Sequence, residues 1–218
     1  MRVRLTRVCV GLLTALLAPL PAGPPLAAGS PAAVGFLLLP TGMFEIVPGE
    51  SSVTFFVPDN RGGFSGHTTR VTGRVVVESP DGGETYTARV TAAIDTPSIT
   101  TDSGPRDAAM RATYLRTSQY PAITFTGTVT SHPGLGIHPF PAPVRGEVTI
   151  RDVTREEQFT ATVVALAQEY LADVSASLRM ADYGIPYPRA FIWVARDPVT
   201  VKLHVRARAC RACSGSPP

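Results

Sequence analysis

The chain has 218 residues, of which 44% are hydrophobic and 17% are charged, a composition typical of a folded globular protein rather than a disordered one. Its length suits one sizeable domain. The net charge of +3 comes from three arginines near the N-terminus, so the rest of the chain is formally neutral. The pI of about 9.0 therefore does not indicate nucleic-acid binding.

The N-terminus has the pattern of a signal peptide. The three arginines precede the apolar run 8–20, and small residues follow, with cleavage expected after Ala28 or Ala32. We therefore expect a signal peptide over 1–32 and an exported protein, periplasmic or extracellular. The alternative is an uncleaved N-terminal anchor, although the run is short for a span of about 20 residues. Residues 29–42 are rich in proline, glycine and alanine, and 33–42 are interpreted as a linker.

The domain is expected over 43–208, where apolar and polar residues alternate with a period of two. This alternation predicts strands with one apolar face. Residues 59–66, with three glycines and an exposed Phe64, are interpreted as a loop. The predicted strands lie at 44–48, 53–57, 71–78, 86–94, 123–130, 144–151, 159–165, 174–180 and 199–208.

One helix is expected over 102–115. Pro105 suits its first turn, where the missing N–H would have no partner, and Asp102 or Ser103 is expected to cap it. The i,i+4 spacing allows Asp107 to pair with Arg111. The same spacing puts Met110 and Tyr114 together on another side of the helix, and Tyr120-Pro121 then ends any helix before the next strand.

Eight or nine strands at hairpin spacing, with one helix, predict an all-β antiparallel sandwich or barrel. The apolar faces mix large residues with many glycines and alanines, which leave room inside. We therefore predict an eight-stranded barrel, or a nine-stranded one, with a lumen for an apolar ligand and the helix over one end. The alternative is that the small residues only fit the taper of a packed barrel. The predicted lumen residues are Phe55, Val57, Val75, Ala88, Val90, Ala92, Ile123, Phe125, Gly127, Phe159, Ala161, Val163, Ala176, Leu178, Met180, Val201 and Leu203.

The C-terminal tail, 209–218, contains Cys210 and Cys213 as a C-x-x-C pair. Zinc would need further ligands, and His204 is only a speculative third one. A local disulfide or free thiols on a flexible tail are the alternatives, and an exported protein allows oxidation. We predict no metal site and no cofactor.

Catalytic patterns are weak. The sequence contains no G-x-S-x-G elbow and no H-E-x-x-H motif. Glu156 and Glu157 are adjacent, so on a strand they face opposite ways and cannot act as a pair. The sequence therefore does not predict an enzyme.

Several segments of the domain follow a known pattern: FEIV and SVTF near the start, VTGRV at 71–75, DTPSITT at 95–101 followed by Arg106-Asp107, YPAITF at 120–125, GEVTIR at 146–151 and DYGI at 182–185. Together they resemble the YceI-like family of exported, lipocalin-like barrels that bind polyisoprenoid lipids. The resemblance runs from Phe44 to about Ala207. Two positions depart from the family pattern: Ala109, where a His is frequent, and Asp152, where a Gly is usual. A Phe-Phe pair that often follows the helix in the family is also missing.

The resemblance implies a carrier or sequestering protein for a polyisoprenoid or isoprenoid quinone, with no chemistry. Near the helix, Arg106, Arg111 and Tyr114 are candidates for the lipid head group, because arginine suits phosphate oxygens. The alternative for each arginine is a surface ion pair of little energetic value. The rival functions are a structural or adhesive exported domain without a ligand, and a hydrolase or isomerase that uses the cavity.

An aromatic stretch follows Gly184. Tyr187, Phe191, Ile192 and Trp193 either contact a membrane surface during lipid loading or plug one end of the barrel. The sequence makes no prediction of the oligomeric state.

Overall fold

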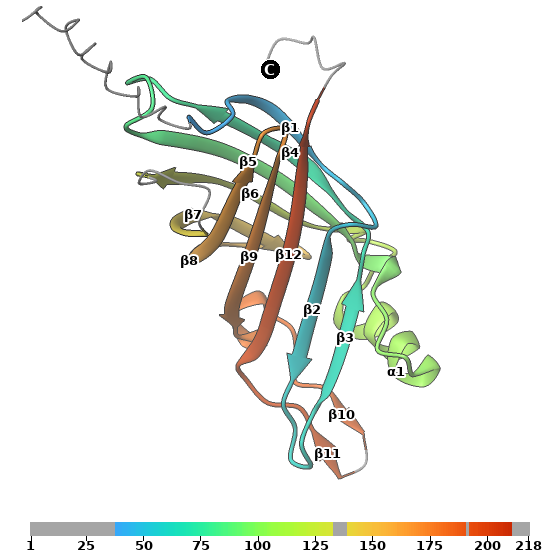
Figure 1. Ribbon diagram of the computed structural model, residues 1–218. Helices are drawn as coiled ribbons and strands as arrows, with labels where there is room; N and C mark the ends of the chain where they lie inside the picture. The colour runs from blue at the N-terminus through green and yellow to red at the C-terminus, as the bar shows by residue number, and fades with distance from the viewer. Residues whose placement is uncertain (1–37, 133–138, 191, 211–218) are drawn as a thin grey trace, which may run out of the picture. The chain divides into compact units, whose positions relative to one another are not determined.

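The computed structural model describes residues 38–132, 139–190 and 192–210. It contains a closed antiparallel barrel of eight strands, in the order β1-β4-β5-β6-β7-β8-β9-β12, with β2 and β3 added beside β12 (Figure 1). This confirms the predicted barrel. The strands are β1 (Gly42–Ile46), β2 (Ser52–Val57), β3 (Phe64–Thr68), β4 (Val71–Glu78), β5 (Tyr86–Asp95), β6 (Ala122–Ser131), β7 (Phe140–Ile150), β8 (Val153–Leu166), β9 (Glu169–Leu178) and β12 (Val199–Ala209).

The barrel closes through β12, which pairs with β9 along one edge and with two strands along the other. On that second edge, β2 pairs with the first half of β12, and β1 pairs with its end, where Phe44 lies opposite Ala209. β1 and β2 therefore act as one long strand with a bend between them. Near the bend, Arg206 donates hydrogen bonds to Glu50 and Glu169, which ties the bend to the β8–β9 hairpin.

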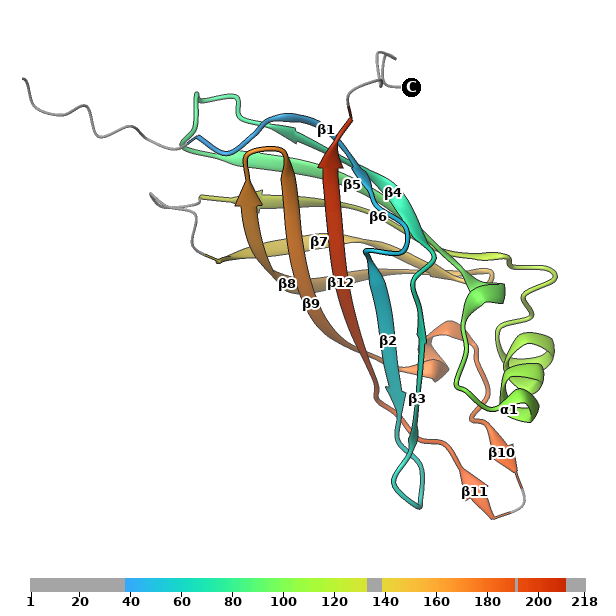
Figure 2. The same cartoon turned by 45° about the vertical axis from the view of Figure 1, so that its right-hand side comes forward.

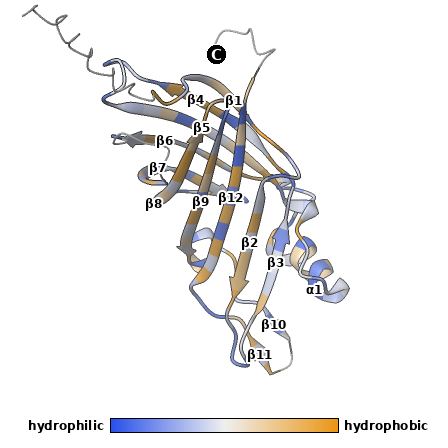
Figure 3. Cartoon of the chain, viewed as in Figure 1, coloured by the Kyte–Doolittle hydropathy of each residue, from blue (hydrophilic) through white to orange (hydrophobic). Residues whose placement is uncertain are grey.

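Apolar and polar residues alternate along the strands, and this alternation directs the apolar side chains into the core. Figure 3 shows apolar and polar residues alternating along β12, and its apolar residues from Val199 to Ala207 face the interior. Ordered packing begins before the expected start at Met43, because Leu39 is buried and its amide donates to the Tyr86 hydroxyl. The residues 39–42 of the predicted linker thus belong to the barrel.

The prediction of a loop over 59–66 is wrong for the second half of that segment, where β3 begins. Phe64 is partly buried rather than exposed and lies opposite Val57 of β2. Gly62 and Gly63 have positive φ values of 131° and 122°, and they make the tight turn between β2 and β3. β3 is short, and its inward positions include Gly66, so its pattern of alternation is too weak to identify a strand.

The helical segment is shorter and less regular than predicted. It consists of the α-helix α1 (Gly104–Ala109), which continues as the π-helical turn η2 (Met110–Tyr114). Ser103 occupies the N-cap position but gives no side-chain cap. The predicted pairing of Asp107 with Arg111 is replaced by other contacts: Asp107 accepts hydrogen bonds from the loop after β5, and Arg111 donates to the carbonyl oxygens of Pro97 and Ile99.

Short elements complete the end of the barrel where α1 lies. They are the 3-10 turns η1 (Thr96–Ser98) and η3 (Met180–Tyr183) and the small hairpin of β10 (Arg189–Ala190) and β11 (Trp193–Val194). The β10–β11 hairpin lies beside the β2–β3 turn in both views (Figure 2). Within the described ranges, no helix is both long and apolar enough to span a bilayer.

Candidate ligand cavity

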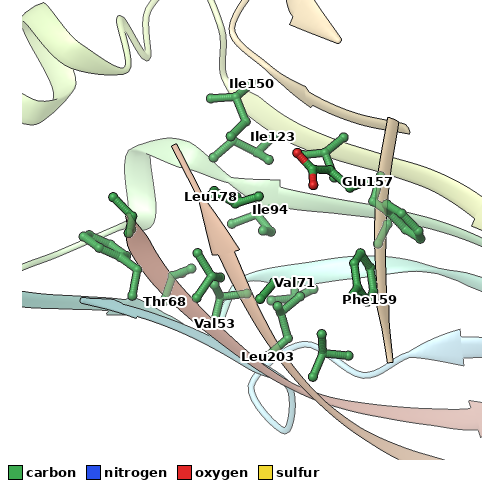
Figure 4. Close-up of a pocket in the computed structure, with 18 of the residues that line it drawn as sticks. Val53, Thr68, Val71, Ile94, Ile123, Ile150, Glu157, Phe159, Leu178 and Leu203 are labelled. Carbon is green, nitrogen blue, oxygen red and sulfur yellow. The ribbon is translucent and has the colours of Figure 1, made fainter. Parts of the chain in front are cut away.

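The interior of the barrel holds a cavity of about 660 Å³. All ten strands of the large sheet contribute to its wall, and α1, η2 and η3 line the end near the helix. The wall is mostly aliphatic and aromatic, as the residues Val53, Ile94, Leu178 and Leu203 in Figure 4 illustrate. A cavity of this size and polarity is typical of a binding site for an apolar small molecule.

All of the predicted lumen residues line this cavity except Gly127. Their contact with a ligand stays a prediction. Gly127 lies opposite Gly146 on β7, and a Cβ placed on it would lie 2.5 Å from the ring of Phe125 and 2.5 Å from the carbonyl oxygen of Arg145. The two glycines therefore do not widen the lumen. They make room for the Phe125 ring, which packs at 5.7 Å from the ring of Phe159.

The end of the cavity away from α1 is covered by aromatic side chains. Phe44 and Tyr170 pack edge to face with ring centroids 4.9 Å apart. The Tyr170 hydroxyl donates to the carbonyl oxygen of Pro40 at 2.6 Å. Burial raises the pKa of Tyr170, with a smaller contribution from nearby Tyr86. This hydroxyl therefore stays neutral and hydrogen-bonded, and it holds the segment before β1 across that end.

At the other end, α1 and η2 put two of the three head-group candidates beside the cavity. Arg106 and Tyr114 line it, together with Met110. The guanidinium carbon of Arg106 lies 4.4 Å from the centroid of the Phe64 ring, a cation–π contact. Arg111 does not line the cavity, because its guanidinium binds the two carbonyl oxygens of the η1 region. Arg111 thus fastens the helical segment, and its prediction as a head-group ligand is not supported by its position.

A carboxylate inside the lumen is the main feature that the sequence analysis missed. Glu157 on β8 lines the cavity, and its Oε1 accepts a hydrogen bond of 2.8 Å from the hydroxyl of Tyr183. Tyr183 is 1% exposed, and burial together with the bond to Glu157 raises its pKa. The signal was present, because the period of two that directs Phe159 inward also directs Glu157 inward.

The aromatic stretch after Gly184 is exposed rather than packed as a plug. Ile192 is 62% exposed, Trp193 is 47% exposed and Tyr187 is 37% exposed, while Phe191 lies outside the described residues. Trp193 also lines the outer part of the cavity. Asn60, in the turn between β2 and β3, bonds to the backbone of residues 192 and 194, so the two hairpin tips are held together.

The residues considered for metal binding do not gather. His204 points its Nδ1 at Asp173, 2.8 Å away, and Cys210 is disulfide-bonded, while Cys213 lies outside the described residues. Among the residues that the structure places, no group of three or more His, Cys, Asp or Glu side chains could hold a metal ion.

Solved structures with the same fold include two bacterial proteins, each 16% identical to this chain. A polyisoprenoid binding domain from Saccharophagus degradans, implicated in plant cell wall breakdown, matches with a TM-score of 0.61 over 78% of this chain and 100% of its own. BcnA from Burkholderia cenocepacia matches with a TM-score of 0.59 over 74% of this chain and 98% of its own. No curated protein is similar in sequence.

The family comparison agrees with the geometry of the barrel. The YceI-like domain model matches residues 44–207, which run from β1 into β12 and include all of the residues that line the cavity except Leu39. These residues form about three quarters of the chain, and they coincide with the segment that contains the sequence motifs. The chain therefore belongs to the YceI-like domain family.

Proposed function

We propose that the protein binds a long-chain apolar lipid of the polyisoprenoid or isoprenoid quinone class in the barrel and carries or sequesters it. The observation that carries this proposal is the apolar cavity of about 660 Å³ inside the barrel. The polyisoprenoid binding domain of Saccharophagus degradans, which has the same fold, supports the same class of ligand.

The energetics favour a long chain over a short one. Burial of one methylene group contributes ~0.8 kcal/mol, whereas association costs roughly 4–15 kcal/mol in lost freedom. A ligand of about ten buried methylene equivalents therefore only begins to offset that cost. A polyisoprenoid supplies many such groups along one thread, and the aliphatic wall requires no particular register of polar contacts.

We propose binding without turnover. Most of the side chains that line the described lumen are apolar. Glu157 accepts a hydrogen bond from Tyr183, and no histidine is hydrogen-bonded to either side chain in the described part of the chain. In the part of the chain that the structure describes, no serine, threonine or cysteine side chain is hydrogen-bonded to a histidine side chain, the arrangement of an activated nucleophile. A carrier needs none of these groups.

We further propose that the protein acts after export and that the paired hairpin tips contact a membrane whose surface is anionic. The signal-like N-terminus supports export. Exposed Ile192 and Trp193 suit the membrane interface. Arg61, whose guanidinium carbon lies 5.9 Å from the centroid of the Trp193 ring, supplies positive charge there. Trp193 also lines the cavity, so a lipid leaving the bilayer at this tip would meet the lumen directly.

Native mass spectrometry with lipid extraction of the purified protein tests the central proposal. We expect a co-purifying lipid, or retention of an added polyprenol or isoprenoid quinone at one molecule per chain, with no change in its mass. Retention of none of these would contradict the carrier proposal and favour the ligand-free structural domain. Conversion of the bound lipid to a product would favour the enzyme alternative.

A further inference from the structure

Glu157 is the carboxylate that β8 contributes to the wall of the cavity, at the place where Tyr183 of η3 reaches it. Its neighbour across the β7–β8 ladder is Gly146, and Gly146 in turn lies opposite Gly127. In Figure 4 the carboxylate of Glu157 lies among apolar side chains, in the same part of the lumen as Ile123 and Ile150. The Asp, His and Arg side chains of the wall are Asp59, His67, Arg106, Arg179 and Arg189, and they come from the end near α1.

The surroundings of Glu157 leave its carboxylate incompletely satisfied. In the part of the chain that the structure describes, the hydroxyl of Tyr183 is the one hydrogen-bond donor to Glu157, and it reaches Oε1 only. No arginine, lysine or histidine of the described residues forms an ion pair with Glu157, and Gly146 opposite it has no side chain to offer. Oε2 is thus left to the contents of the cavity.

An ionised carboxylate beside an apolar wall is stabilised strongly by any donor that reaches it and destabilised by a second negative charge. A hydroxyl or N–H group on the ligand would supply the missing hydrogen bond. A phosphate or pyrophosphate at the same place would add like-charge repulsion in a medium of low polarity. The lumen therefore discriminates between lipids by the charge of the group that lies beside Glu157.

We propose that Glu157, held by Tyr183, is a specificity-determining group that selects an isoprenoid with an uncharged hydrogen-bond-donating head, such as a long-chain alcohol, over its phosphorylated form. This inference rests on the proposed lipid-binding function. The chain fills the apolar lumen, and the head hydroxyl donates to the carboxylate. An anionic head is met instead by Arg106, which α1 puts beside the cavity.

Three probes test the proposal: geranylgeraniol, geranylgeranyl phosphate and the head-free isoprenoid hydrocarbon squalene, each titrated into delipidated protein. In the wild-type protein we expect the alcohol to bind more tightly than the phosphate. Glu157→Gln keeps the size of the side chain and removes its charge. We expect it to weaken alcohol binding about tenfold, as the loss of a charged hydrogen bond implies, to strengthen phosphate binding, and to leave squalene binding unchanged.

Two further variants separate the carboxylate from its surroundings. Glu156→Gln changes an exposed glutamate on the opposite face of the same strand and is expected to bind all three probes as the wild type does. Tyr183→Phe removes the phenol and is expected to keep the preference for the alcohol. Thermal unfolding of each variant confirms that the barrel is intact.

The outcomes are distinguishable. If squalene binds but the ratio of alcohol to phosphate affinity is the same in the wild type and in Glu157→Gln, the role of Glu157 is overturned while lipid binding stands. If the preference disappears in Tyr183→Phe but not in Glu157→Gln, the phenol is the selecting group, which also overturns the proposal. If none of the three probes binds the wild type, the proposed function itself fails.

Discussion

Asp107 accepts hydrogen bonds from both the backbone amide and the hydroxyl of Thr101, at 2.8 and 2.6 Å. The hydroxyl of Thr100 adds a third at 2.6 Å. Asp107 is only 6% exposed, so these bonds join the buried face of α1 to the segment that leaves β5. That segment is also bonded to β3, through Thr100 and His67. A single carboxylate thus fixes the helix to the segment that is bonded to β3, the outermost of the two added strands.

Replacement of Asp107 by Asn is expected to destabilise the fold. The amide cannot accept as many hydrogen bonds, and its NH2 group faces donors, so a loss of about 2 kcal/mol in the free energy of unfolding is expected. Chemical denaturation measures this difference. The matched control is Asp102→Asn, at a side chain that is 79% exposed. Equal stability of the Asp107 variant and the control would show that the anchor contributes nothing.

The same carboxylate predicts a dependence of stability on acid. Burial raises the pKa of Asp107, but the hydrogen bonds from Thr100 and Thr101 outweigh it and the net pKa is lowered. A group whose pKa is lower in the folded state stabilises the protein above its unfolded pKa, and this contribution is lost as the pH falls through that value toward the folded one. The advantage of the wild type over Asp107→Asn should therefore be full at neutral pH and shrink below about pH 4.

Asp81 adds a similar acid dependence that does not disturb this comparison. Hydrogen bonds from the backbone and side chain of Thr85 lower its pKa to about 2. Asp81 lies in the β4–β5 turn, far along the chain from α1, and is the same in both proteins, so its contribution cancels in the difference. A gap between wild type and Asp107→Asn that stays constant down to about pH 2 would contradict the prediction for Asp107.

The alternation of the strands was sufficient to predict the barrel because each strand has one face in the lumen and one in solvent. β6 and β12 show this most clearly, and their inward residues line the cavity as expected, with the exception of Gly127. The family motifs added the resemblance to a YceI-like barrel, which the family model confirms. Alternation shows which face of a strand a residue lies on. It does not show in which direction the side chain extends on that face or how deeply it is buried. This is why Gly127 was interpreted as open space when the Phe125 ring covers it.

The contacts that the sequence could not reveal are those between segments distant in the chain. The bond between Tyr183 and Glu157 joins η3 to β8, and the bonds of Arg111 join η2 to the end of η1. β3 was missed because a strand of five residues with two preceding glycines has little local preference. Its partner strand β2 and its bridge to Thr100 determine its conformation. Such elements are decided by tertiary packing rather than by local pattern.

Filling the lumen should abolish lipid uptake without unfolding the barrel. Ala161→Phe places a ring into the cavity from a residue that is 4% exposed, and Ala176→Phe does the same from β9. We expect lipid retention to be lost in both, with little change in circular dichroism. The controls are Thr160→Phe and Ser177→Phe, which face outward on the same strands.

These variants are better placed than a substitution at Gly127. A side chain there would collide with the Arg145 carbonyl oxygen, a backbone atom that cannot move aside. The loss of uptake could then reflect an unfolded barrel. If Ala161→Phe and Ala176→Phe fold and retain lipid as well as their outward controls do, the ligand lies outside the barrel.

Truncating the exposed apolar side chains of the hairpin tips should weaken binding to anionic membranes. Ile192 and Trp193 can each bury apolar area worth about 1.5–3 kcal/mol in a bilayer interface, so the double variant to Ser is expected to lose at least tenfold in affinity for vesicles that contain phosphatidylglycerol. Co-sedimentation measures this affinity. Leu166→Ser is the control, because Leu166 is also exposed, at 37%, but belongs to the β8–β9 hairpin at the opposite end of the barrel.

Since Arg61 lies over Trp193, wild-type binding should also fall with added salt and be weak on neutral vesicles. Equal binding by the tip variant and the Leu166 control would place any membrane contact elsewhere on the protein.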